Sequence, residues 1–196
     1  MIPAPIYADN LRLAEQVSKI PGCIVECGVW RGGMSAGLVK VLGPERDYFL
    51  LDSFEGLPLA KDIDGQAALD WQNNIESPNY YDNCSATPEF AQQAMNLAGA
   101  RSFQLVKGWF DQTLPTFMLP SAIALLRLDA DWYESTTICL QHLFDKVMPG
   151  GLIILDDYYA WDGCSKALHD FLSCRSAAER IQSLGEICYL KKRFTQ

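Results

Sequence analysis

The sequence has little histidine: only two of its 196 residues are histidine, and both fall in stretches predicted to be helical. His142 and His169 are therefore better explained as packed or surface residues of those helices than as catalysts. The seven cysteines form no C-x-x-C pair, which disfavours a structural zinc site. Several of them lie in apolar stretches, where a buried free thiol is the usual state and a reducing cytoplasm the usual setting.

Basic charge and long apolar runs are also scarce. The net charge is −8 and the sequence pI is near 4.7, whereas proteins that bind a phosphate backbone carry basic surfaces. No uncharged apolar run reaches about 18 residues, and no basic segment followed by an apolar core opens the chain. We therefore expect a soluble cytoplasmic protein with neither a nucleic acid nor a membrane as partner. Its 49% hydrophobic and 20% charged content are ordinary for one globular domain, residues 1–196.

Short apolar stretches alternate with amphipathic ones along the chain. This alternation predicts an α/β three-layer sandwich with a mostly parallel sheet, and two consecutive strands at the end add an antiparallel C-terminal edge. The first helix is expected to begin with Asp9 as its cap. The predicted strands are 23–28, 48–51, 103–106, 122–128, 152–155, 180–184 and 187–190, and the predicted helices are 9–20, 35–42, 89–97, 136–147 and 166–172.

Residues 53 to about 88, here called the insert, show no periodic signal. The insert is rich in Asp, Asn, Pro, Gly and aromatic residues and is too long for an ordinary connection between two elements. Segments of this length in a compact domain are commonly lids or binding loops. We therefore predict that the insert is a lid or binding loop; the alternative, a disordered segment, is disfavoured by Trp71, Tyr80 and Tyr81.

A glycine-rich turn links the first predicted strand to the next helix. Glycines allow a ligand to approach the backbone, and the first N–H groups of a helix attract anionic groups. The spacing around Gly28 is not G-x-G-x-x-G, and the bulky Val29 and Trp30 would crowd a pyrophosphate. Asp52 ends the second predicted strand, 24 residues after Gly28 (52 − 28), where an acidic residue commonly binds ribose hydroxyls. Together these residues favour an adenosine-type ligand without choosing between NAD and a smaller cofactor.

Acidic residues follow two further predicted strands. Asp129 and Asp131 come after strand 122–128, and Asp156 and Asp157 come after strand 152–155. The carboxyl ends of parallel strands meet at one edge of a sheet, so these carboxylates should lie together. They would repel one another and be costly to bury without a compensating cation or shared protons. A hard divalent cation with oxygen ligands is the expected compensation.

Several motifs occur in a fixed order from about Cys23 to the C-terminus. They resemble the macrocin O-methyltransferase family of class I S-adenosylmethionine-dependent enzymes, whose members methylate sugar hydroxyls on macrolide and aminocoumarin natural products. The ordered set is far more specific than any one motif. It consists of Glu26-x-Gly28-x-x-x-Gly32-Gly33, Leu51-Asp52-Ser53-Phe54-Glu55-Gly56-Leu57-Pro58, Lys107-Gly108-Trp109-Phe110, Thr113-Leu114-Pro115, Leu128-Asp129-Ala130-Asp131-x-Tyr133-x-Ser135-Thr136 and Asp156-Asp157-Tyr158.

The resemblance implies a seven-stranded Rossmann-like sheet, S-adenosylmethionine at the first two strand ends and a bound Mg²⁺. Cofactor contacts would come from Glu26, Gly28 and Ser35 at the methionine portion, Asp52 and Ser53 at the ribose, Gly108 and Trp109 near the adenine, and Asp129. The metal ligands would be Asp129, Asp156 and Asp157, with Asp131 as a competing ligand, and Asp129 would also be the general base. The acceptor would be a small-molecule hydroxyl, with a sugar favoured and a phenol or catechol compatible; a homo-oligomer is compatible too.

Three other functions remain open at this point. Asp129-Ala130-Asp131 fits the D-x-D pattern of Mg²⁺-dependent phosphohydrolases that use an aspartate nucleophile, although that pattern normally ends the first strand of its domain. A nicotinamide-dependent oxidoreductase is disfavoured by the bulky turn and the acidic cluster. A domain that binds S-adenosylmethionine only for regulation is disfavoured by the complete set of carboxylates.

Overall fold

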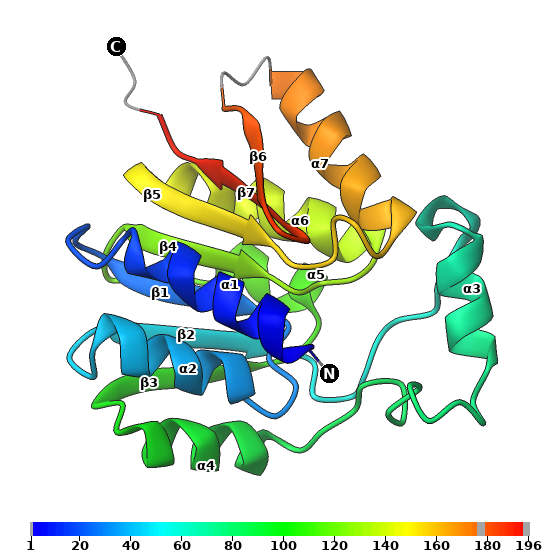
Figure 1. Cartoon of the computed structure of the whole chain (residues 1–196), viewed down its shortest axis with the longest axis horizontal. Coiled ribbons are helices and arrows are strands. Elements are labelled where there is room, and N and C mark those ends of the chain that lie inside the picture. Colours follow the sequence, from blue (N-terminus) through cyan, green and yellow to red (C-terminus); the bar gives the residue numbers. More distant parts are fainter. Residues whose placement is uncertain (1, 176–178, 194–196) are drawn as a thin grey trace.

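The structure, a computed structural model, describes residues 2–175 and 179–193. Within them lies a seven-stranded sheet in the order β3-β2-β1-β4-β5-β7-β6 (Figure 1). β1 to β5 are parallel, β7 is antiparallel to β5, and β6 pairs antiparallel with β7 at the outer edge. The predicted mostly parallel sheet is confirmed. The strands are β1 (Cys23–Cys27), β2 (Asp47–Asp52), β3 (Ser102–Lys107), β4 (Ile123–Leu128), β5 (Val147–Leu155), β6 (Ile181–Leu184) and β7 (Ile187–Lys191).

Helices cover both faces of the sheet and complete the three layers. One face carries α1 (Ala4–Glu15), α2 (Gly33–Leu42) and α4 (Pro88–Ala98), and the other carries α5 (Phe110–Thr113), α6 (Tyr133–Leu143) and α7 (Asp162–Arg175) (Figure 1). Successive residues of a strand point to opposite faces, so Leu125 and Leu126 of β4 enter separate cores. Of the helices that the structure describes, none combines the length and apolar composition needed to cross a membrane.

The register of the central strands brings the predicted site residues to one edge. Cys27 of β1 pairs with Leu128 of β4, which pairs with Leu155 of β5. The ladder then continues, because Asp129 N–H donates to the Cys27 carbonyl at 2.8 Å and Asp156 N–H donates to the Leu128 carbonyl at 2.9 Å. Asp129 and Asp156 therefore leave adjacent strands at the same level.

The first helix begins earlier than the sequence pattern predicts. α1 starts at Ala4, after Pro3 at the cap position, so the prediction that Asp9 caps a helix over 9–20 is wrong. Pro5 lies in the first helical turn, where proline is tolerated because the N–H it lacks has no intrahelical partner. Asp9 instead lies inside α1 and pairs with Arg12 at 2.7 Å.

Other boundaries also differ from the predicted ones: β5 begins five residues before the predicted 152–155, and α7 extends beyond the predicted 166–172 at both ends. The helix predicted over 136–147 is shifted: α6 covers Tyr133–Leu143, a 3₁₀ turn η3 (Phe144–Lys146) follows, and Val147 already belongs to β5. The insert also contains regular structure that its sequence did not predict, namely η1 (Asp62–Asp64) and α3 (Gln66–Asn73). α3 buries only Ala68, so it has no apolar stripe to detect. A 3₁₀ turn η2 (Leu114–Thr116) follows α5.

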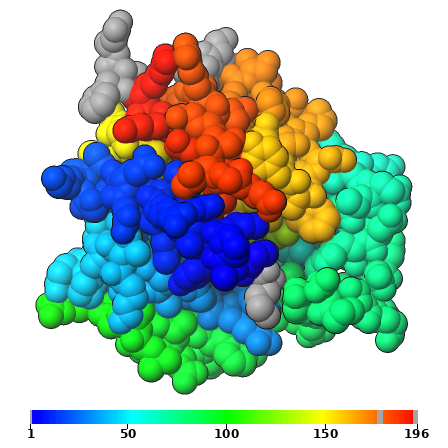
Figure 2. Space-filling view, in the orientation of Figure 1, coloured from blue at the N-terminus to red at the C-terminus, as the bar shows by residue number. Residues whose placement is uncertain are grey.

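The insert lies beyond the carboxyl ends of the parallel strands, where α3 stands apart from the sheet layers (Figure 1). Figure 2 shows it as a lobe on the right-hand side of the molecule.

All seven cysteines are free thiols, as predicted, and five of them are buried.

Candidate active site

The carboxyl ends of β1, β2, β4 and β5 open into a cavity of about 860 Å³, and part of the insert lines it too. None of its lining residues, all from the described part of the chain, is a histidine. Two predicted site residues, Ser35 and Gly108, do not line the cavity themselves. Ser35 lies behind Glu26, to which it donates a hydrogen bond, and Gly108 donates its N–H to the Asp52 carbonyl at 2.9 Å. The other predicted site residues line the cavity: Glu26, Gly28, Asp52, Ser53, Trp109, Asp129, Asp156 and Asp157.

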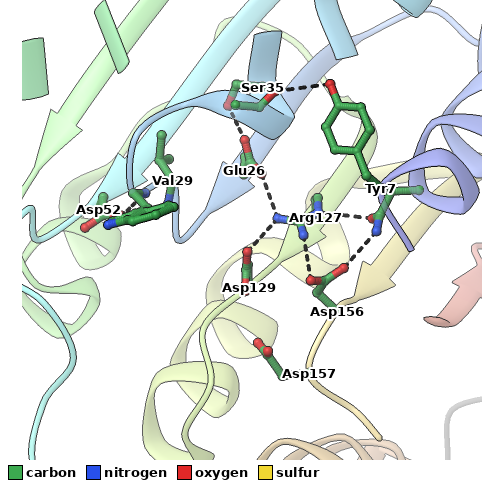
Figure 3. A network of polar contacts seen from close by, with 12 residues as sticks. Tyr7, Glu26, Val29, Ser35, Asp52, Arg127, Asp129, Asp156 and Asp157 are labelled. Atoms are coloured by element: carbon green, nitrogen blue, oxygen red, sulfur yellow. Dashed lines mark hydrogen bonds and ion pairs between the residues drawn. The ribbon is translucent and has the colours of Figure 1, made fainter. Parts of the chain in front are cut away.

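A buried arginine lies at the centre of the acidic residues. The Arg127 side chain is fully buried and its Nη1 lies 2.7 Å from Glu26 Oε1 and 3.0 Å from Asp129 Oδ2 (Figure 3). Its Nη2 lies 2.9 Å from Asp156 Oδ2. Its Nε donates to Asn10 Oδ1 at 3.1 Å. One guanidinium thus connects the carboxylate expected at the cofactor with two of the carboxylates expected at the metal.

Arg127 does not neutralise the whole cluster. Burial raises the pKa of Asp157 well above its usual range, and the neighbouring Asp131 and Asp129 raise it further. Burial, and then Asp129, raise the pKa of Asp131 in the same way. Burial also raises the pKa of Asp129, although Arg127 acts in the opposite direction. These carboxyl groups therefore favour their protonated forms in the absence of a further cation, and a bound cation would stabilise their ionised forms.

Three carboxylates are arranged closely enough to share such a cation. Asp129, Asp156 and Asp157 each place one oxygen within 4.8 Å of the others. Hard divalent cations prefer an all-oxygen donor set of this kind. The all-oxygen donor set, and the repulsion among its carboxylates when they are ionised, fit the cation that the sequence predicts.

Asp131, the competing ligand, has other partners. Its carboxylate accepts a hydrogen bond from Trp161 Nε1 at 3.0 Å, and its own N–H donates to Asp157 Oδ2 at 3.1 Å. Its backbone is left-handed, with φ of 55°, which is uncommon for a residue other than glycine. These contacts leave Asp131 beside the three clustered carboxylates and hold Asp157 through the backbone.

The Asp52 carboxylate organises two turns at the other end of the cavity. Its Oδ2 accepts the N–H groups of Val29 and Trp30 at 2.7 and 2.8 Å, and its Oδ1 accepts that of Phe54 at 2.6 Å (Figure 3 shows Asp52 beside Val29). Trp30 and Phe54 both have left-handed backbones, with φ of 48° and 56°. Asp52 therefore stabilises the glycine-rich turn and the start of the insert together.

Gly28 is required by the close approach of two strand ends. Its φ is 86°, and a Cβ at this position would overlap the backbone carbonyl of Asp129. A side chain would thus separate the glycine-rich turn from the carboxylate cluster. This requirement is steric and does not depend on a ligand.

The insert is attached to the sheet domain by buried polar and aromatic contacts. Asp64 is buried, and its Oδ1 accepts the N–H of Tyr133, the first residue of α6, at 2.7 Å. Trp71 of α3 packs against Trp132 and Trp161, with ring centroids 6.3 and 6.1 Å apart. Trp132 Nε1 also donates to the Pro58 carbonyl at 2.9 Å. The insert therefore forms an aromatic wall of the cavity.

Several of these residues were not identified from sequence. Arg127 is the one with a detectable signal, because a charged residue inside a strand of apolar residues must have a buried partner. Asn10 is fully buried and Asp64 nearly so, yet each lies in a polar segment that looks solvated in sequence.

The raised pKa of Glu26 predicts a pH dependence of stability. Burial raises this pKa from 4.5 to about 7, against the lowering effect of Arg127 and Ser35. Between these values the unfolded chain has lost the proton that the folded state retains, so stability falls as the pH rises. At about 1.36 kcal/mol for each pKa unit, the loss of unfolding free energy is about 3 kcal/mol.

We expect urea denaturation in EDTA to show this decline, and Glu26→Gln to make it shallower. Asp129, Asp131 and Asp157 also have raised pKa values, so a smaller decline should remain. Glu15→Gln, at an exposed position on α1, serves as a matched control and should retain the full decline. An identical slope in Glu26→Gln and the wild type would contradict the prediction.

The strand order and the cavity at the strand ends define a Rossmann-like protein of the methyltransferase type. The O-methyltransferase NovP has the same fold, with a TM-score of 0.78 and 27% identity over 96% of this chain and 79% of that one. The calicheamicin methyltransferase CalS11 shares the fold at 23% identity, with a TM-score of 0.73 over 94% of this chain and 77% of that one.

The chain belongs to the macrocin-O-methyltransferase family, whose model matches residues 9–192. It is similar to the 8-demethyl-8-(2,3-dimethoxy-alpha-L-rhamnosyl)-tetracenomycin-C 4'-O-methyltransferase of Streptomyces olivaceus. The two sequences are 37% identical over 175 residues, and the match covers 83% of this chain and 64% of that protein. It is also similar to the mycinamicin III 3''-O-methyltransferase of Micromonospora griseorubida. Here the sequences are 30% identical over 168 residues, and the match covers 83% of this chain and 65% of that protein. The chain thus spans less than two thirds of the length of these relatives.

The aspartate phosphohydrolase hypothesis is not supported. The family match covers the glycine-rich turn and both acidic motifs, and the relatives are O-methyltransferases. The D-x-D motif follows β4, beside β1, and its first carboxylate is paired with Arg127. Its similarity to the hydrolase pattern is therefore local.

Proposed function

We propose that this protein is an S-adenosylmethionine-dependent and divalent-metal-dependent O-methyltransferase that acts on a hydroxyl of a small molecule, with a sugar hydroxyl of a natural product as the favoured acceptor. The observation that carries the proposal is one cavity that contains both the turn organised by Asp52 and the cluster of Asp129, Asp156 and Asp157. The names of two relatives specify methylation at the 4' position of a rhamnosyl compound and at the 3'' position of mycinamicin III.

The cofactor residues are assigned by their positions around the first strand ends. Glu26 lies at the end of β1, where it can accept hydrogen bonds from the amino group of the methionine portion, and Ser35 holds the Glu26 carboxylate from behind. Asp52 and Ser53 follow β2 and would bind the ribose, with Gly108 and Trp109 after β3 near the adenine. S-adenosylmethionine supplies an electrophilic methyl group in this arrangement.

Asp129, Asp156 and Asp157 would hold a divalent cation, with Mg²⁺ proposed. Such a cation lowers the pKa of a hydroxyl that it contacts and fixes its direction. Asp129 is proposed to remove the hydroxyl proton as the oxygen receives the methyl group. Methyl transfer needs an in-line approach of the oxygen to the methyl carbon, so the fixed positions of these side chains supply much of the rate.

The acceptor is proposed to lie between the acidic cluster and the insert. Trp71, Trp132 and Trp161 all line the cavity; Trp71 and Trp161 are partly exposed, and Trp132 is almost fully buried. Trp161 also donates to Asp131, which connects the aromatic wall to the acidic cluster. Binding sites for ring-shaped ligands commonly combine aromatic faces with a few convergent polar groups.

The free thiols and the net charge support a proposal for the location of the protein and for its partners. We propose that residues 1–196 form a single methyltransferase domain that works in the cytoplasm, where seven free thiols are stable. The net charge of −8 argues against a nucleic acid partner.

Calorimetric titration of S-adenosylmethionine and NAD⁺, with Mg²⁺ and then with EDTA, tests the cofactor class. We expect saturable binding of S-adenosylmethionine and none of NAD⁺. Transfer of a labelled methyl group to a panel of rhamnosides, other glycosides and catechols then tests the reaction, which should stop in EDTA and resume with Mg²⁺. Failure to bind S-adenosylmethionine would refute the proposal, and transfer that persists in EDTA would refute its metal dependence.

A further inference from the structure

Protein groups already contact one carboxylate oxygen of Asp129 and both carboxylate oxygens of Asp156. Asp129 Oδ2 and Asp156 Oδ2 lie 3.0 and 2.9 Å from the Arg127 guanidinium. Asp156 Oδ1 accepts a hydrogen bond from Asn10 Nδ2 at 2.8 Å. Both side chains are therefore oriented by the protein before any ligand is present (Figure 3 shows Arg127 between Asp129 and Asp156).

Asn10 is the residue that closes this arrangement from outside the sheet. It lies on α1, is fully buried, and is 146 residues from Asp156 in the chain. Its Nδ2 donates to Asp156 and to the Ile6 carbonyl, the latter at 3.1 Å, while its Oδ1 accepts from Arg127 Nε at 3.1 Å. The Asn10 amide thus uses both of its polar atoms and contacts both the arginine and the carboxylate.

We propose that Asn10 and Arg127 are positioning residues that present Asp129 and Asp156 to the divalent cation in fixed orientations. This inference rests on the metal dependence in the proposed function. A carboxylate that must be immobilised when the cation binds loses conformational freedom, whereas one held in advance does not. Arg127 additionally reduces the repulsion between the carboxylates, so a change there alters both charge and orientation.

Asn10 separates these two effects because it is neutral. Asn10→Leu removes both polar atoms without changing the charge of the site, and Asn10→Ala does the same without adding bulk. Metal affinity typically falls by about 10–100-fold when a residue that orients metal ligands is replaced. We expect the dissociation constant for Mn²⁺ to rise by about that factor in both variants, with an altered electron paramagnetic resonance spectrum of the bound ion.

Leu13→Ala provides a matched control on the same helix. Leu13 is fully buried and contacts the core instead of the acidic cluster. This variant should melt at a lower temperature through loss of packing and still bind Mn²⁺ like the wild type. The comparison distinguishes a positioning role of Asn10 from a general weakening of α1.

In the experiment each folded variant is titrated with Mn²⁺, and binding is measured by calorimetry and by the electron paramagnetic resonance spectrum of the bound ion. S-adenosylmethionine is titrated separately in EDTA. Wild-type Mn²⁺ affinity in both Asn10 variants would overturn the inference, as would an equal loss in Leu13→Ala or an absence of Mn²⁺ binding by the wild type. Failure of the methyltransferase proposal would instead appear as a lack of S-adenosylmethionine binding or of methyl transfer by the wild type.

Discussion

Replacement of Asp129 by asparagine is expected to slow methyl transfer by about 10²–10⁴-fold, the usual contribution of a positioned general base. The amide has nearly the shape of the carboxylate but cannot take the hydroxyl proton. It also removes one negative charge from the three carboxylates that lie within 4.8 Å of one another. Binding of S-adenosylmethionine should be largely retained, because Glu26, Asp52 and the glycine-rich turn are unchanged.

The measurement is the rate of transfer at saturating acceptor, together with calorimetry of S-adenosylmethionine. Asp145→Asn is the matched control, since Asp145 is exposed, pairs with Arg175 on the surface and lies just before the amino end of β5, whereas the acidic cluster lies at the carboxyl ends of the strands. Its rate should equal that of the wild type. Full activity of Asp129→Asn with the same acceptor would remove the role assigned to this residue.

Arg127→Met should lower the free energy of unfolding by about 3–5 kcal/mol at neutral pH, as is typical when one partner of a buried ion pair is removed. The methionine fills much of the space but leaves Glu26, Asp129 and Asp156 without their shared cation. These carboxylates can escape the penalty by binding protons. The difference between variant and wild type should therefore shrink as the pH falls toward about 4.5, near the ordinary pKa of a carboxyl group.

Urea denaturation in EDTA across this pH range measures the effect. Arg175→Met is a useful comparison because Arg175 and Asp145 are both substantially exposed, and surface ion pairs contribute about 0–1 kcal/mol. A loss in Arg127→Met no larger than in Arg175→Met would show that the buried guanidinium is not needed to hold the carboxylates.

The parts of the site that could be predicted are those encoded over short stretches of sequence. Gly28 and Asp52 each end or follow an apolar strand, and Asp129, Asp156 and Asp157 do the same. Because parallel strands end at a common edge, a correct list of strands was enough to bring these residues together. The resemblance implies a seven-stranded Rossmann-like sheet, and the order of its strands is given by the structure.

The parts that could not be predicted depend on contacts between distant segments. Arg127 pairs with Glu26, 101 residues away, and with Asn10, 117 residues away. The acidic motifs predict compensation by a divalent cation, whereas the fold supplies part of it with this arginine. Nothing near Asn10 in sequence distinguishes it from an exposed residue of an amphipathic helix.

The contacts that seat the insert have a consequence for how the molecule is made. Asp64 meets Tyr133, Pro58 meets Trp132, and Lys61 meets Glu134, across 69, 74 and 73 residues of chain. At synthesis rates of about 5–20 residues per second, the insert waits roughly 4–15 s for these partners to be made. The wall of the cavity is therefore completed late, and Trp71 is exposed to other chains during that interval.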